Sequence, residues 1–325
     1  MIGRMRSSLL LAIGATALLT CGQAKAAYFV FNTLEDPNDT AGYTAATGVN
    51  ATTVVGFYNF PADTNGFSYN ISSATYSPVT VGGAAMTAAS GISSSGEVAG
   101  TAYYAPPTTH GFTSTGSPTV FTDDPSGPAA TTANGVNASG TVVGSYFNGS
   151  TTVGYVTTSP ISSGTFTSIF VPSTVSPTVI ATQALGINNS NTIVGTYTDN
   201  TGQHGFVKSG GTYTGLDVPG SFSTVATGID SAGDVVGYYT DGAGEHGFVD
   251  DGGTFTTIDD PNGIGATLVL GVNDLSQVVG LFTASNGETF GFLATEMPEP
   301  GTLALFGLPI MGMVVLHRRR ALARA

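Results

Sequence analysis

An internal repeat of about 43 residues runs through this chain and limits the folds that it can adopt. The clearest copy reads Gly-Ile-Asp-Ser-Ala-Gly-Asp-Val-Val-Gly-Tyr-Tyr over 228–239, His-Gly-Phe-Val over 246–249 and Thr-Phe-Thr-Thr-Ile over 254–258. Such a repeat is one small structural unit, which buries its apolar surface only by stacking on its neighbours. The copies are spaced 43, 44, 51, 42 and 43 residues apart and begin at Gly48, Gly91, Gly135, Gly186, Gly228 and Gly271.

Each copy predicts four short strands. They are the apolar pair at Gly-Ile or Gly-Val, then Val-Val-Gly-x-Tyr, Gly-Phe-Val and Thr-Phe-Thr-x-Ile. β-Branched and aromatic residues favour strands, and no segment sustains a helical period. The consecutive apolar residues of Val-Val-Gly predict a strand buried on both faces, as in a sheet stacked between two others. Four strands in about 43 residues are typical of a propeller blade, so we predict an all-β, six-bladed β-propeller.

The link between the first two strands of a copy has the residues of a type I turn. Asn137 and Asp230 occupy its first position, and Gly140 and Gly233 its fourth. In another copy Asn191 replaces the glycine, and asparagine tolerates the same left-handed backbone. Thr53 and Ser276 stand where the pattern expects this glycine. The pattern therefore does not predict the type of turn in these two copies.

The start of the repeat region predicts how the ring closes. The segment from Tyr28 to Asn38 is similar to the fourth strand of a copy, such as Phe255–Asn262, yet it precedes any first strand. The sixth copy has three strands and ends after Leu293. We therefore expect the N-terminal strand to complete the last blade, which would leave no open sheet edge.

Residues 1–26 have the layout of a secretory signal peptide. Arg4 and Arg6 precede a short apolar stretch over 9–19, and Ala24 and Ala26 are the small residues that a signal peptidase needs. The apolar stretch is short for a permanent membrane anchor. We expect cleavage after Ala26 and an exported repeat domain at 27–295.

Cys21 offers an alternative to ordinary cleavage. The sequence Leu-Leu-Thr-Cys at 18–21 loosely resembles a lipoprotein processing site, in which the cysteine is acylated, although Thr20 fits that site poorly. Cys21 is the only cysteine of the chain. After cleavage at Ala26, the exported domain would therefore contain no disulfide.

Residues 296–325 combine a short polar motif, an apolar segment and a basic end. The motif is Pro298-Glu299-Pro300, the apolar run covers 303–316, and Arg318-Arg319-Arg320 follows. The run of about 14 residues is short against the ~20 of a stable transmembrane helix. The arginines favour a cytoplasmic position. The two prolines disfavour helix at Glu299 and keep its backbone extended and accessible to an enzyme.

This order of features resembles the PEP-CTERM tail of bacterial exported proteins. The resemblance implies that an exosortase-like sorting enzyme recognises Pro298-Glu299-Pro300 while the apolar segment holds the chain transiently in the inner membrane. It implies a final location in the cell envelope, at the cell surface or outside the cell. A plain C-terminal anchor that is never cleaved is the alternative. The repeats resemble the HAF type of extracellular repeat, with His-Gly-Phe as the triplet here, which implies a secreted repeat protein and no known activity.

The charge of the region between the two terminal signals excludes some partners. Residues 27–296 contain 20 acidic residues and a single basic one, Lys208, for a formal net charge of −19. Such a domain repels nucleic acids and anionic membranes. The segment from Asp230 to Asp234 comes nearest to a calcium loop, but it lacks the alternating oxygen ligands of one and is better explained as a turn.

The histidines of the repeats do not predict a catalytic site. His110, His204 and His246 occupy one repeat position, whereas a catalytic site needs different residues that converge at one place. The Asp-Pro pairs at 36–37, 124–125 and 260–261 recur at strand ends and predict turns. The sequence contains no phosphate loop, nucleophile elbow or zinc-binding pair, so we predict no cofactor, metal or catalytic residue.

Two classes of function fit this sequence. The first is a non-catalytic surface or extracellular-matrix protein that binds polysaccharide or protein. The alternative is a propeller-type carbohydrate hydrolase or lyase, because propellers carry such sites at the mouth of the axial channel. The enzyme hypothesis predicts that the acidic residues that break the repeat, Asp63, Glu97 and Glu288, meet in one pocket.

Overall fold

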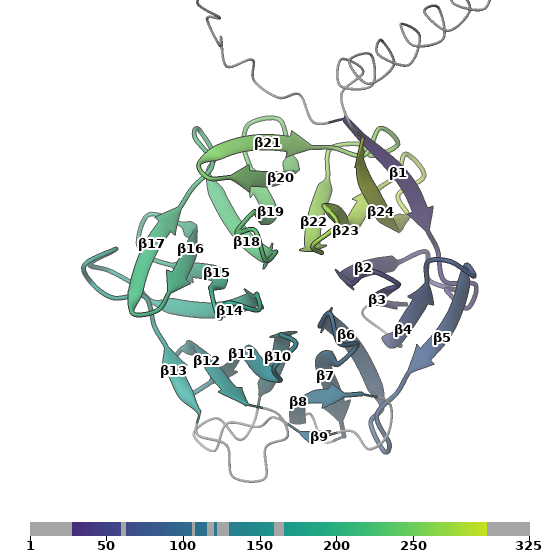
Figure 1. Ribbon diagram of the computed structural model, residues 1–325, viewed down its shortest axis with the longest axis horizontal. Helices are drawn as coiled ribbons and strands as arrows, with labels where there is room; N and C mark the ends of the chain where they lie inside the picture. The colour runs from purple at the N-terminus through teal and green to yellow at the C-terminus, as the bar shows by residue number, and fades with distance from the viewer. Residues whose placement is uncertain are drawn as a thin grey trace, which may run out of the picture.

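The computed structural model describes residues 28–59, 63–105, 108–115, 120–121, 130–158 and 166–297. These residues form six four-stranded antiparallel sheets arranged around a central axis (Figure 1). The predicted six-bladed β-propeller is therefore confirmed. The predicted signal peptide at 1–26 and the tail from Pro298 onward lie outside the described residues.

The first three blades follow the chain in order, from the innermost strand to the outermost. Blade 1 contains β2 (Thr44–Val49), β3 (Thr53–Tyr58), β4 (Asn65–Asn70) and β5 (Thr75–Val79). Blade 2 contains β6 (Met86–Ile92), β7 (Val98–Tyr104), β8 (Thr108–Ser114) and β9 (Val120–Phe121). Blade 3 contains β10 (Thr131–Val136), β11 (Thr141–Phe147), β12 (Thr152–Thr158) and β13 (Thr167–Ile169).

Blades 4 and 5 repeat this order, and blade 6 takes its outer strand from the other end of the chain. Blade 4 contains β14 (Ala181–Ile187), β15 (Ile193–Thr198), β16 (Gln203–Ser209) and β17 (Thr212–Leu216). Blade 5 contains β18 (Ser223–Ile229), β19 (Val235–Thr240), β20 (Glu245–Asp251) and β21 (Thr254–Ile258). Blade 6 contains β22 (Thr267–Val272), β23 (Gln277–Thr283), β24 (Thr289–Met297) and β1 (Tyr28–Leu34).

The pairing of β1 with β24 confirms the predicted closure. The two strands are antiparallel, with register from Tyr28 opposite Met297 to Leu34 opposite Gly291. Figure 1 shows β1 beside β24, although the two strands lie at opposite ends of the sequence. Strand β24 continues to Met297, so Glu296 and Met297 belong to this strand as well as to the start of the segment that we assigned to the tail.

The first glycine of each copy allows the inner strands to approach one another around the axis. A Cβ atom on Gly48 would lie 2.8 Å from the Cα of Gly91, and one on Gly186 would lie 3.0 Å from the Cα of Gly228. In all six blades the ladder between the first two strands also shifts register just before this glycine. Any side chain at these positions would push neighbouring blades apart, so glycine sets the width of the channel.

The core lies between the blades. Val54 and Val55 are both fully buried, which confirms that the second strand is covered on both faces. The glycine that follows such an apolar pair makes room for a ring from the third strand: a Cβ on Gly195, after Ile193 and Val194, would lie 2.9 Å from the ring of Phe206. These rings have no exposed surface and form the largest buried side chains; they are Phe67, Phe112, Tyr155, Phe206, Phe248 and Phe292.

The turns between first and second strands follow the predicted pattern in five blades. Gly140, Gly233 and Asn191 have positive φ, and Ser276 adopts the same left-handed conformation with φ of 54°. Blade 1 differs because its turn is one residue shorter. The Asn50 N–H bonds to the carbonyl of Thr53, three residues on, whereas Asn137 bonds to Thr141, four residues on. Thr53 therefore starts strand β3 and has no counterpart of the turn glycine.

The Asp-Pro pairs lie where the fourth strand of one blade leads into the next blade. Asp36 and Asp260 are each only 3% exposed, and one carboxylate oxygen of each accepts hydrogen bonds from Asn38 and Asn262 respectively. These contacts confirm the turn assignment for both pairs. The pair Asp124-Pro125 lies outside the described residues.

Candidate binding site at the channel mouth

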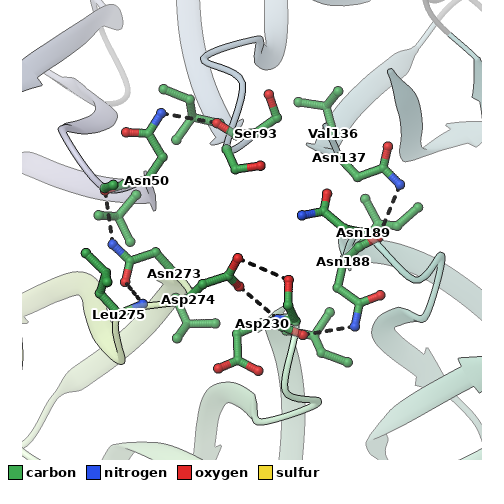
Figure 2. Close-up of a pocket in the computed structure, with 18 residues that line it drawn as sticks. Asn50, Ser93, Val136, Asn137, Asn188, Asn189, Asp230, Asn273, Asp274 and Leu275 are labelled. Atoms are coloured by element: carbon green, nitrogen blue, oxygen red, sulfur yellow. Dashed lines mark hydrogen bonds between the residues drawn. The ribbon is translucent and has the colours of Figure 1, made fainter. Parts of the chain in front are cut away.

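The turns between first and second strands surround one mouth of the central channel. They enclose a cavity of about 200 Å³, to which all six blades contribute (Figure 2). The first residue of each turn is buried, and the second residue faces the opening. We call the first set the turn ring, which consists of Asn50, Ser93, Asn137, Asn188, Asp230 and Asn273.

Each asparagine of the turn ring first stabilises its own turn. The side-chain oxygen of Asn137 accepts the backbone N–H groups of Ser139 and Thr141, at 3.1 and 3.0 Å. The oxygens of the other asparagines make equivalent bonds, as does one oxygen of Asp230. This bonding explains the preference for Asn or Asp at the start of the turn.

The amide nitrogens of the asparagines link the blades. Asn137 donates to the carbonyl of Asn188 at 3.1 Å, and Asn188 donates to the carbonyl of Asp230 at 2.9 Å. Asn273 of blade 6 donates to the carbonyl of Asn50 in blade 1 at 3.0 Å, and Asn50 donates to Ser93. Asparagine suits this position because its side chain carries both an acceptor and a donor. The mouth is therefore held by side chains as well as by sheet packing.

The two members of the turn ring that are not asparagine lie in blades 2 and 5, on opposite sides of the channel. Ser93 accepts the N–H of Glu97 at 3.0 Å but has no amide that could reach blade 3. Asp230 has no donor when ionised, so it makes no equivalent bond to blade 6. Between blades 5 and 6 the backbone N–H and the hydroxyl of Ser231 donate to the Asp274 carboxylate instead, at 2.9 and 3.1 Å.

The second residues of the turns form the rim of the mouth, and they vary from blade to blade. We call them the rim residues: Ala51, Ser94, Ala138, Asn189, Ser231 and Asp274. Figure 2 shows Asn189 and Asp274 directed toward the opening, whereas the Asp230 carboxylate points away from it. The rim thus presents hydroxyl, amide and carboxylate groups on a rigid support. A ligand at this mouth would meet the rim residues rather than the turn ring.

A group of acidic side chains disfavours the binding of anions at the mouth face of blade 5. Burial raises the pKa of Asp234, and the neighbouring charges of Asp230, Asp251, Glu296 and Asp250 raise it further. This concentration of acidic groups lies on the same face as the mouth. The described residues contain no group of three or more His, Cys, Asp or Glu side chains that could hold a metal ion.

The histidines lie at the opposite face and have structural contacts. His204 Nδ1 lies 3.0 Å from Asp217, its Nε2 lies 3.4 Å from Asp199, and its ring stacks on Tyr197 at 5.2 Å. His246 repeats this arrangement with Asp259, Asp241 and Tyr239. Each histidine joins the start of the third strand to the end of the fourth.

His110 lies in the third strand of its blade at the same position, opposite Ala102, and its ring lies 5.4 Å from that of Tyr104. All three histidines therefore occupy equivalent places in three different blades, as the sequence predicts. They do not converge.

The three acidic residues that break the repeat do not meet. Glu97 directly precedes β7 and lies in the turn on the mouth face. Asp63 and Glu288 precede β4 and β24, so they lie in loops at the opposite ends of the strands. The structure therefore separates Glu97 from the other two by the height of a blade, and it gives the hydrolase hypothesis no shared pocket.

The predicted processing residues cannot be compared with this site, because they lie outside the described residues. They are Ala24, Ala26, Pro298, Glu299, Pro300, Arg318, Arg319 and Arg320. Within the part of the chain that the structure describes, no helix has the length and apolar character needed to cross a membrane.

Of the turn ring, sequence reasoning named Asn137 and Asp230, and it named them only as turn residues. The second role of the turn-ring asparagines, the bond to the next blade, depends on residues 42 to 51 positions away, or 223 for Asn273. The repeat of Asn at one position in four of six copies was the available signal. The rim residues carry no repeated pattern, and sequence reasoning missed them.

No family model matches this chain, and no curated protein matches it. Solved structures with a similar fold include a putative TolB from Agrobacterium tumefaciens, at 13% identity and a TM-score of 0.53, covering 79% of this chain and 91% of that one. A mutant of AofleA from Arthrobotrys oligospora has 11% identity and a TM-score of 0.50, covering 84% and 90%. A mutant Aleuria aurantia lectin has 10% identity and a TM-score of 0.47, covering 78% and 93%. At these identities the similarity to the first two structures concerns the fold alone.

Proposed function

We propose that this protein is an exported, non-catalytic binding protein that holds neutral polysaccharide at its channel mouth. The observation that carries the proposal is the division between the turn ring and the rim residues. The turn ring fixes the geometry through bonds between blades, and the rim presents unlike polar groups to solvent. A rigid scaffold with a varied polar rim reduces the entropy lost when a flexible polymer is bound.

The charge of the domain supports a neutral ligand. A formal net charge of −19 over residues 27–296 repels acidic polymers, and Asp274 adds negative charge at the mouth itself. Hydroxyl and amide groups both donate and accept hydrogen bonds and a carboxylate accepts them, which suits the hydroxyl groups of sugars. Protein surfaces of suitable chemistry are the second class of partner for the same face.

Delivery to the exterior is part of the proposal. A signal peptidase would remove residues 1–26, and an exosortase-like enzyme would act at Pro298-Glu299-Pro300 after transient anchoring in the inner membrane. The closing strand pair supports this arrangement, because the last paired residue, Met297, comes directly before Pro298. The domain would then act in the cell envelope, at the cell surface or in the matrix.

The test is a binding assay of the purified protein against neutral and acidic oligosaccharides, with hydrolysis products monitored in the same samples. We expect neutral oligosaccharides to bind without being cleaved. Asn189→Ala should weaken binding while leaving the melting temperature close to that of the parent, because Asn189 contributes only one bond to Ala138. Cleavage of a bound oligosaccharide, or a lack of binding to the whole panel, would overturn the proposal.

A further inference from the structure

A second cavity opens between blades 1 and 2 and adjoins the channel mouth. Its volume is about 520 Å³, within the range of about 300–1,000 Å³ usual for small-molecule pockets. The mouth, at about 200 Å³, lies below that range. The two cavities share Asn50, Ile92 and Ser94 in their walls, so they are neighbours. We call the second cavity the blade 1–2 groove.

The shortened turn of blade 1 lines this groove. Asn50, Thr52 and Thr53 form part of its wall, and this is the turn that lacks one residue. In blade 3 the equivalent turn runs Asn-Ala-Ser-Gly-Thr, whereas blade 1 has Asn-Ala-Thr-Thr. Blade 1 therefore contributes one turn residue fewer beside the groove. The groove is therefore associated with a specific departure from the repeat.

The wall of the groove has the chemistry of a site for neutral, hydroxylated ligands. Half of the residues that line it are serine or threonine, and none carries a charged side chain. Ser94 and Thr80 are exposed and lie at separate places along the wall. Val79 and Val98 contribute apolar surface beside these hydroxyls. Hydroxyl groups that donate and accept, next to apolar surface, match the hydroxyl and C–H faces of a sugar ring.

Other ligand classes fit this wall less well. Among the described residues of the wall, a metal cation would find no carboxylate or imidazole ligand and an anion would find no basic partner. A purely apolar ligand would leave the hydroxyls without partners, at a cost in free energy.

From the shared wall and the chemistry of the groove we infer that the blade 1–2 groove and the channel mouth form one extended site for a linear neutral polysaccharide. One part of the polysaccharide binds at the rim residues, and its adjoining sugar units bind in the groove. The inference rests on the proposed function, because it assigns the same ligand class to a longer site. Its distinguishing consequence is that affinity increases with the length of the oligosaccharide until the groove is filled.

The experiment measures affinity for oligosaccharides of increasing length, using neutral glucose, mannose, galactose and N-acetylglucosamine series and an acidic galacturonic acid series. Ser94→Trp places a large ring where the two cavities meet, and Thr80→Trp fills the groove away from the mouth. Thr214→Trp is the matched control, because Thr214 is exposed on the outer strand β17 of blade 4. A further variant inserts one glycine between Thr52 and Thr53, which restores the five-residue turn.

We expect Ser94→Trp to weaken all neutral oligomers by about tenfold or more. Thr80→Trp and the glycine insertion should weaken only the longer oligomers by a similar factor, and Thr214→Trp should bind like the parent. All four proteins should keep the parent's melting temperature, which shows that they are folded. Should a tryptophan variant fail to fold, the insertion variant carries the test.

The outcomes separate the two claims. If the parent binds neutral oligosaccharides equally at every length, or the groove variants bind long oligomers like the parent, the extended site is wrong while the proposed function stands. If the parent binds no neutral oligosaccharide, the proposed function fails and the extended site fails with it.

Discussion

Tyr28 lies opposite Met297 at the outer end of the strand pair that closes the propeller. This pair joins residues from the two ends of the domain and completes the antiparallel sheet of blade 6. Because the ring is closed in this way, the first and last residues of the domain lie side by side in blade 6. The channel mouth is lined by residues at the turns between first and second strands, and none of them belongs to this closing pair.

The bonds between blades at the turn ring should contribute to stability. Asn188→Asp keeps the side-chain oxygen that Ser190 and Thr192 need but removes the amide that bonds to the Asp230 carbonyl. We expect the free energy of unfolding to fall by about 1–3 kcal/mol, the usual cost of leaving a buried polar group unpaired. Urea denaturation measures it.

The reverse substitution in blade 5 is the matched control for the turn ring. Asp230→Asn supplies the amide that could reach the backbone of Asn273, and it keeps the oxygen that bonds to Gly233 and Asp234. We expect the free energy of unfolding to rise by about 1 kcal/mol. Equal stability of both variants and the parent would show that the turn ring does not link the blades.

His246 should gain stability from a hydroxyl that its equivalent in blade 4 already has. The Nε2 atom of His204 lies 2.9 Å from the Thr201 hydroxyl, whereas Ala243 occupies that position in blade 5. His246 Nε2 lies 3.5 Å from Asp241 but is buried without a hydrogen-bond partner. We expect Ala243→Thr to stabilise the protein by about 1 kcal/mol and Thr201→Ala to destabilise it similarly. Thermal unfolding of the two variants at neutral pH checks both signs. A loss of stability in Ala243→Thr would contradict the expected hydrogen bond between the introduced hydroxyl and His246 Nε2.

Asp260 should make stability depend on pH. Burial raises the pKa of this carboxyl, although hydrogen bonds from Asn262 partly oppose the rise, and its Oδ2 atom has no partner. Because the folded-state pKa exceeds the unfolded one, ionisation of Asp260 destabilises the fold above the folded pKa. That cost is absent below the unfolded pKa. Blade 4 has the uncharged Val218 at the equivalent position, where its N–H likewise bonds to a buried threonine.

Asp260→Asn removes this charge and keeps an oxygen for Asn262. We expect the variant to be more stable than the parent at neutral pH, and we expect the gain to shrink as the pH falls toward the ordinary pKa of aspartate. Denaturant unfolding over a series of pH values measures both. A gain that is constant with pH would mean that ionisation of Asp260 costs the fold nothing.

The sequence predicted the fold closely because the relevant signals are local and repeated. Strand identity, blade number and the closing strand follow from Gly-Ile-Asn, Val-Val-Gly and an unmatched strand at Tyr28–Leu34. The candidate site was harder to predict because it depends on distances between blades. The bond from Asn273 to Asn50 and the contacts between His204 and two aspartates arise only once the chain has folded. The blade 1–2 groove lies beside a turn that is one residue shorter than its equivalents, and such an omission has no motif of its own.

The C-terminal motif makes a prediction about the protein in its native host. If an exosortase-like enzyme processes Pro298-Glu299-Pro300, mass spectrometry of the mature protein should detect peptides from β24 but none from the apolar run at 303–316. Abundant peptides from that run would instead support an uncleaved anchor. Replacement of Glu299 by alanine is the matched control, and it should restore those peptides in the membrane fraction.

The closure of the ring by the N-terminal strand is the central claim, and a disulfide trap tests it most directly. Val30 and Thr295 are opposite each other in the closing pair, and Val30 is 44% exposed, so cysteines there should not disturb the core. Directly opposed residues lie within reach of a disulfide. In a Cys21→Ser background, Val30→Cys with Thr295→Cys should oxidise to a monomer that migrates faster on a non-reducing gel and melts at higher temperature. Absence of that crosslink, or its formation only between molecules, would contradict a ring closed by its own N-terminal strand.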